Sequence, residues 1–172
     1  KNNFNINIKN LNSIGKNDSE YKTSPQVELM SDFEITSSLP LIKENNSNKN
    51  FFTPKLSFRF NPSDMKNYSS SERKINISNI FSNNRLGLDD SFESGRSLTL
   101  GIDYRTEDLD DINKFFEFKM ATVFRDKEEN LLPKVSTLNR KNSNLFGSIS
   151  SNYFDYLNLN YNFSIDNDLN SF

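Results

Sequence analysis

Polar and hydrophobic residues alternate without interruption from Arg96 to Arg105, in the sequence RSLTLGIDYR. The hydrophobic phase contains Leu98, Leu100, Ile102 and Tyr104, and the polar phase contains Ser97, Thr99, Gly101 and Asp103. Successive residues of a strand point to opposite faces of a sheet. This stretch therefore predicts a strand with one hydrophobic and one polar face.

The same period of two recurs along the chain. It appears at residues 3–12, 27–41, 54–61, 113–125, 144–151 and 157–165, which makes about seven strands in all. No stretch has a helical period of comparable quality. The pattern predicts an all-β, antiparallel fold.

The predicted connections between these strands alternate in length. Residues 62–95 and 126–142, and with them 15–26, form long connections, whereas 42–53, 106–111 and 151–156 lie at the opposite ends of the strands. Transmembrane barrels carry long loops on one side and short turns on the other. We therefore expect an antiparallel transmembrane β-barrel segment, with the long loops outside the cell and the short turns in the periplasm.

The cost of charge in lipid decides which face of such a barrel meets the membrane. An Arg or Lys that faces lipid near the midplane costs about 2–4 kcal/mol. We therefore expect Arg59, Asp103, Glu117 and Lys119 to point into the lumen. The predicted lipid-facing residues are Phe58, Phe60, Leu98, Leu100, Ile102, Phe116, Phe118, Leu159, Tyr161 and Phe163. A soluble antiparallel sandwich stays open as an alternative, because alternation alone does not separate the two folds.

Composition narrows the class of protein. Only 34% of residues are hydrophobic, yet the chain has 16 Phe and 6 Tyr and a net charge of only -2, whereas disordered chains have few aromatics and high net charge. The sequence contains neither His nor Cys, which excludes Ser-His-Asp and Cys-His catalysis and Cys-ligated metal sites within it. It also lacks an apolar run of about 18 residues, so no transmembrane helix is predicted. We expect no enzymatic activity, no cofactor, no metal and no nucleic-acid partner.

The segment Ser78–Gly101 resembles the LptD family of outer-membrane lipopolysaccharide-assembly proteins. The resemblance is carried by Asn79-Ile80-Phe81-Ser82, by Asn84-Arg85-Leu86-Gly87-Leu88-Asp89, and by Glu93-Ser94-Gly95 with the strand that runs to Gly101. The stretches Phe58–Tyr68, Phe124–Lys127 and Leu157–Asn170 are similar to the family as well. The likeness thus covers at least residues 54–170.

This resemblance implies a function and a set of partners. It implies a large barrel in the outer membrane of a Gram-negative bacterium, plugged by an LptE-type lipoprotein, that inserts lipopolysaccharide into the outer leaflet. It also implies a periplasmic Lpt bridge that docks on an N-terminal jelly-roll domain, which this sequence does not contain. We expect residues 1–172 to be an internal fragment of the C-terminal barrel. Another outer-membrane barrel, such as a porin or nutrient transporter, stays open as an alternative.

The family-like loop also has a physical interpretation of its own. Gly87 can adopt a positive φ, and Arg85 can pair with Asp89 or Glu93. These features would let the 62–95 loop fold back and cap the lumen. We expect the motif residues to order this loop, with contact to the plug protein or to lipopolysaccharide as the alternative role.

Overall fold

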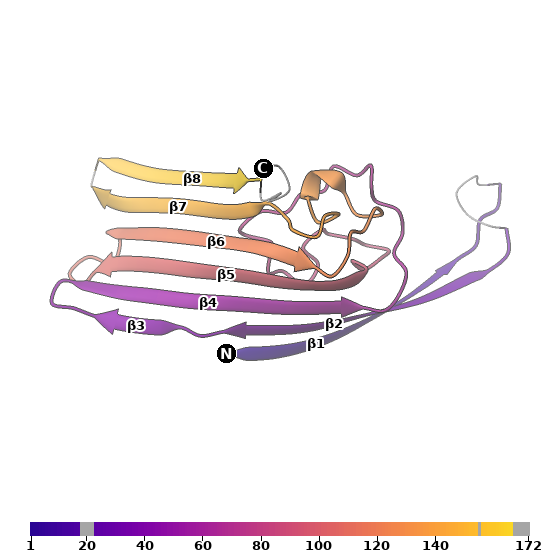
Figure 1. Ribbon diagram of the computed structural model, residues 1–172, viewed down its shortest axis with the longest axis horizontal. Coiled ribbons are helices and arrows are strands. Elements are labelled where there is room, and N and C mark those ends of the chain that lie inside the picture. The colour runs from indigo at the N-terminus through magenta and orange to yellow at the C-terminus, as the bar shows by residue number, and fades with distance from the viewer. Residues whose placement is uncertain (18–22, 155, 167–172) are drawn as a thin grey trace.

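The computed structural model describes residues 1–17, 23–154 and 156–166, and these form one antiparallel sheet of eight strands (Figure 1). The strands are β1 (Asn2–Ser13), β2 (Gln26–Ser38), β3 (Leu41–Glu44), β4 (Asn48–Asn61), β5 (Gly95–Asp108), β6 (Phe115–Arg125), β7 (Leu145–Phe154) and β8 (Leu157–Ile165). Their order across the sheet is β1-β2-β4-β5-β6-β7-β8, and β3 pairs with β4. The predicted all-β, antiparallel fold is confirmed.

The region around Pro40 differs from the prediction. The alternating stretch 27–41 is divided there: β2 ends at Ser38, and β3 begins at Leu41 and pairs with the start of β4. Proline has no backbone N–H and interrupts a ladder of hydrogen bonds. The sheet therefore has eight strands where the pattern predicted about seven. Most of the segment 42–53, expected to be a short connection, belongs to strands as well, because β3 runs to Glu44, β4 begins at Asn48, and Glu44 pairs across from Lys49.

The connections do alternate in length. The long connections 14–25, 62–94 and 126–144 lie at one end of the strands, and the turns at 45–47 and 109–114 lie at the other (Figure 1). Of the first long connection, residues 18–22 lie outside the described part. Gly95, expected at the end of the 62–95 loop, is the first residue of β5. The 126–144 connection contains the only helical turn in the described residues, the 3-10 helix η1 (Lys134–Ser136).

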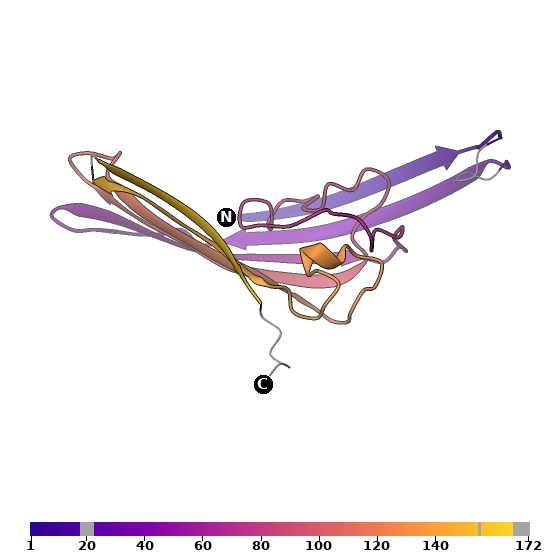
Figure 2. The same cartoon turned by 90° about the horizontal axis from the view of Figure 1, so that it is seen from above.

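The two faces of the sheet have different surroundings. Figure 2 shows the sheet curving along its length, with the 62–94 segment on one side of it. We name that side the inner face and the opposite side the outer face. All ten residues expected to face lipid lie on the outer face, as the cross-strand pairs of Leu98 with Phe58 and of Phe118 with Ile149 illustrate. There Phe58, Leu100, Leu159 and Tyr161 are exposed and the other six are half-buried.

Charged side chains are distributed very unequally between the two faces. Arg59, Asp103, Glu117 and Lys119 all lie on the inner face, as the alternation predicted. Within the described strands, charge on the outer face is restricted to Arg96 at the long-loop end and to Lys43 and Asp108 at the short-turn end. Between these two ends, the described part of the outer face carries no charge.

A small hydrophobic core lies between the loops and the inner face. The 62–94 loop contributes Met65, Ile75, Ile80, Leu86 and Leu88, the 126–144 loop contributes Leu132 and Leu138, and the sheet contributes Ala121, Val123 and Phe146. Burying such side chains stabilises the loops by about 1.5–3 kcal/mol each. This core therefore packs the two loops against part of the inner face. In the described part of the chain, no helix is long and apolar enough to span a membrane.

Candidate functional site

The 62–94 loop makes a tight turn at its family-like motif. Gly87 has a φ of +62°, in the left-handed region that favours glycine. The Asn84 side chain closes the turn from within, because its Oδ1 accepts a hydrogen bond from the Leu88 amide at 2.8 Å and its Nδ2 donates to the Leu88 carbonyl at 2.9 Å. The positive φ expected for Gly87 is confirmed.

Arg85 fastens this turn to β5. Its guanidinium forms a forked pair with Glu93, with Nε 2.8 Å from Oε2, and it also donates to Thr99 Oγ1 at 3.0 Å and to Ser97 Oγ at 3.1 Å. The Arg85 side chain is completely buried. Of the two carboxylates expected as partners, Glu93 is the one used, whereas the exposed Asp89 lies near Arg73.

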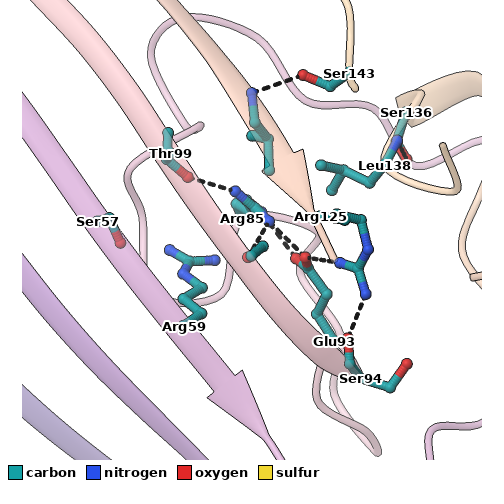
Figure 3. Close-up of polar contacts among 12 residues, drawn as sticks. Ser57, Arg59, Arg85, Glu93, Ser94, Thr99, Arg125, Ser136, Leu138 and Ser143 are labelled. Atoms are coloured by element: carbon teal, nitrogen blue, oxygen red, sulfur yellow. Dashed lines mark hydrogen bonds and ion pairs between the residues drawn. The ribbon is translucent and has the colours of Figure 1, made fainter. Parts of the chain in front are cut away.

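Glu93 links the loop to β6 as well. Arg125 Nη1 donates to Glu93 Oε1 at 2.5 Å, and Arg125 Nη2 donates to the Ser94 carbonyl (Figure 3). A carboxylate shared by two buried guanidinium groups makes charge-assisted hydrogen bonds, which are stronger than neutral ones. Glu93 thus joins Arg85 of the loop to Arg125 of β6.

Arg59 fastens the loop to β4. Its Nε and Nη2 donate to Glu34 Oε1 on β2 at 3.0 and 2.8 Å, and Nη2 also donates to the Ser82 carbonyl in the loop. Ser57 donates to the same carboxylate oxygen at 2.9 Å. We name Glu34, Arg59, Arg85, Glu93 and Arg125 the arginine–glutamate cluster. It holds the long loop against the inner face.

The cluster makes the loop sensitive to acid. Burial raises the pKa of Glu93, but the positive charges of Arg85 and Arg125 outweigh burial and lower this pKa from 4.5 to about 2. A folded state that binds fewer protons than the unfolded state gains stability with pH. Glu93 therefore contributes its full stabilisation above pH 4.5, and this contribution, on the order of 3 kcal/mol, disappears as the pH falls toward 2.

Loop protection from protease, measured on the full-length protein from pH 5 to pH 2, should decline across this interval. A Glu93→Gln variant should lack that part of the decline, and an unchanged profile would contradict the assignment.

Phe81 packs where β5 has no side chain. A Cβ added at Gly101 would lie 2.8 Å from Phe81 Cζ and 2.9 Å from Ala121 Cβ, which is closer than real contacts allow. The Lys55 ammonium lies over the same ring, with Nζ 5.6 Å from the centre of the Phe81 ring. The glycine thus provides the space for an aromatic residue of the loop.

Enlarging Gly101 should detach Phe81 from the sheet. We expect Gly101→Leu to destabilise the folded protein by about 1–3 kcal/mol, because an overpacked site forces its neighbours to move. The measurement is urea unfolding of the full-length protein in lipid. The double variant Gly101→Leu with Phe81→Ala should recover part of the loss, and simple addition of the two losses would contradict the contact.

Beyond the loop, the inner face carries a polar groove of about 370 Å³. Its lining combines charged pairs with hydroxyl and amide groups: Lys55, Asp103, Glu117, Lys119, Ser148, Ser150, Asn160 and Asn162, with Ile77, Ser78 and Phe81 from the loop. Lys55 pairs with Asp103, and Lys119 Nζ lies 2.7 Å from Glu117 Oε1. Such groups bind hydroxyl-rich and charged ligands through many alternative hydrogen bonds. Among the described residues, no group of three or more acidic side chains could hold a metal ion.

The structure brings most of the family-like residues to one place. Ile80 is in the hydrophobic core, Phe81 covers Gly101, Ser82 accepts from Arg59 through its carbonyl, and Gly95 has a φ of +77° beside the Arg125 guanidinium. Sequence reasoning did not identify Glu34 or Arg125 as members of the cluster. The signal for Arg125 was present in the family-like stretch Phe124–Lys127, whereas nothing in the spacing of β2 distinguishes Glu34 from its neighbours.

Comparison with known proteins gives one result. The model of the family LptD, described as LPS transport system D, matches residues 5–172. No curated protein and no solved structure matches the chain. The match extends over nearly the whole sheet and both described long loops, and it includes every residue of the arginine–glutamate cluster. The chain belongs to the LptD family of LPS transport proteins.

Proposed function

We propose that this chain forms part of the wall of an outer-membrane β-barrel that delivers lipopolysaccharide to the outer leaflet. The family match supports the cargo. The outer face supports the membrane location, because its middle has no charged residue while aromatic and aliphatic side chains are exposed there. A hydrophobic sheet face that has no protein partner is costly in water and favourable in lipid.

The height of this uncharged zone fits a bilayer. On β5 it is bounded by Arg96 and Asp108, twelve residue steps apart. At about 3.3 Å per step this is about 40 Å along the strand, and a tilt of about 40° reduces it to about 30 Å across the membrane. Hydrocarbon cores are about 30 Å thick. This agreement is the observation that carries the membrane proposal.

The arrangement of the loops supports a sidedness for the barrel. In our proposal the long connections 62–94 and 126–144 lie at the cell surface and the short turns lie in the periplasm, where an Lpt bridge supplies the cargo. The polar groove of the inner face accepts the sugar portion of lipopolysaccharide, and the acyl chains leave sideways into the membrane. An LptE-type lipoprotein occupies the lumen of the complete barrel as a plug.

A porin or nutrient channel is the alternative proposal. The 62–94 loop packs on the inner face, and the arginine–glutamate cluster holds it there, which favours an obstructed lumen over an open pore. Single-channel recording of the full-length protein distinguishes the two. A steady open conductance would support the channel, whereas a closed baseline is the result expected for lipopolysaccharide assembly.

Depletion of the full-length protein in its host tests the proposed function. We expect lipopolysaccharide to disappear from the cell surface and to accumulate behind the outer membrane. Complementation with the unaltered gene should restore the surface population. Unchanged surface lipopolysaccharide after depletion would refute the assembly role.

A further inference from the structure

Arg96 differs from every other arginine in the chain. Arg59, Arg73, Arg85, Arg105, Arg125 and Arg140 each lie within 4.0 Å of a carboxylate oxygen. No such pair is found for Arg96 among the described residues, and its guanidinium carbon lies 5.2 Å from the centre of the Phe60 ring. A cation held over an aromatic face keeps its hydrogen-bond donors available in the plane of the fork.

The position of Arg96 in the sheet is also distinctive. It lies on the outer face at the long-loop end, at the boundary where the uncharged zone stops. In a membrane-spanning sheet, long cationic side chains at this boundary extend toward the headgroups while their stems cover apolar surface. Phe60 provides such an apolar support.

A groove of about 480 Å³ opens beside this side chain. Lys127 lines it as a second cation, and Glu129 lines it with a carboxylate that accepts hydrogen bonds from the Ser94 hydroxyl at 2.8 Å and the Leu131 amide at 3.2 Å. Asp64 and Asp126 line the groove too. The groove thus holds three carboxylates and two cations, and the guanidinium that lies over Phe60, that of Arg96, has no carboxylate within 4.0 Å among the described residues.

From these observations we propose that Arg96, with Lys127, binds the phosphate of a phosphorylated lipid in the leaflet at the long-loop end. The inference rests on the proposed membrane-spanning role of the sheet. A guanidinium fork matches two phosphate oxygens and stays charged at every physiological pH. The site takes its ligand from the membrane, because Phe60 and Arg96 are cross-strand partners on the outer face at the edge of the uncharged zone.

The test uses full-length protein in nanodiscs that contain lipid A, either with its phosphates or after their removal. Native mass spectrometry measures the lipid retained by the unaltered protein, by Arg96→Gln and by Arg140→Gln. Arg140 is the control, because it is a half-buried arginine of the 126–144 loop whose guanidinium already pairs with Asp166 at 2.9 Å.

We expect Arg96→Gln to weaken retention of phosphorylated lipid A roughly tenfold, since hydrogen bonds to charged groups are strong. Arg140→Gln should have no effect, and the dephosphorylated lipid should be retained equally by all three proteins. Equal retention of phosphorylated lipid by Arg96→Gln would overturn the proposal. Equal retention of phosphorylated and dephosphorylated lipid A by the unaltered protein would overturn the phosphate as the group that is bound.

A separate fluorescence measurement tests the membrane-spanning sheet itself. A tryptophan placed at Leu100, in the middle of the uncharged zone, should be quenched by brominated lipids in the same nanodiscs. Quenching together with unchanged lipid retention refutes only the phosphate site. Absence of quenching refutes the membrane-spanning sheet on which the phosphate site depends.

Discussion

Replacement of Glu93 by alanine is expected to release the 62–94 loop from the inner face. The change leaves Arg85 and Arg125, whose side chains are 0% and 2% exposed, without their shared carboxylate. Breaking a buried ion pair by removing one partner costs about 3–5 kcal/mol, because the remaining charges stay desolvated. The loss should appear as a lower urea midpoint of the full-length protein and as rapid cleavage of the loop by added protease.

Asp89→Ala is the matched control in the same loop. It removes another carboxylate near an arginine, but the Asp89 side chain is 93% exposed and its nearest pair, with Arg73, spans 3.8 Å. Water screens such pairs almost completely. We expect no change in midpoint or cleavage. Equal behaviour of the two variants would show that the arginine–glutamate cluster does not hold the loop.

An arginine at Leu100 is expected to destabilise the protein in a bilayer by about 2–4 kcal/mol, the cost of a cation facing lipid near the midplane. Leu100 is 40% exposed on the outer face and has Leu56 and Thr122 beside it on the neighbouring strands. There is room for a longer side chain, so the expected loss comes from charge and not from packing. Urea unfolding of the full-length protein from lipid vesicles measures it.

Two comparisons separate charge from position. Leu100→Met keeps an apolar side chain of similar volume and should change stability little. Thr36→Arg places the same charge on the inner face, since Thr36 pairs across from Ser57, and it should be tolerated. A Leu100→Arg protein as stable in vesicles as Leu100→Met would argue against lipid contact at this face.

The strands were predictable because each is specified locally. A period of two is visible within eight to ten residues, and it located the central part of every long strand and separated the two faces. The exceptions depend on distant segments. β3 arises because Pro40 breaks a continuous pattern, and the polar residues Asn48–Asn50 become strand because β5 extends to Asp108 and pairs with them. Nothing within those residues signals a partner nearly 60 positions away.

The candidate site divides in the same way. The pairing of Arg85 with Glu93 and the turn at Gly87 lie within a few residues of each other and were accessible from the motif. The other contacts of the cluster pair Arg59 with Glu34 and Arg125 with Glu93, and they form only after the register of β2, β4, β5 and β6 is fixed. The hydrophobic core was missed for a related reason. Ala121, Val123 and Phe146 occupy inner positions, where the alternation predicted polar residues, because the loops cover them.

The most direct test of the membrane-spanning sheet is a photo-crosslinking scan along β5 in intact outer membranes. A photoreactive amino acid is placed in turn at each position from 98 to 103 of the full-length protein. The account predicts crosslinks to lipid at 98, 100 and 102, and crosslinks within the protein at 99, 101 and 103. Lipid crosslinks that do not alternate between successive positions would contradict the membrane-spanning sheet. A complete absence of lipid crosslinks at these positions would contradict it as well.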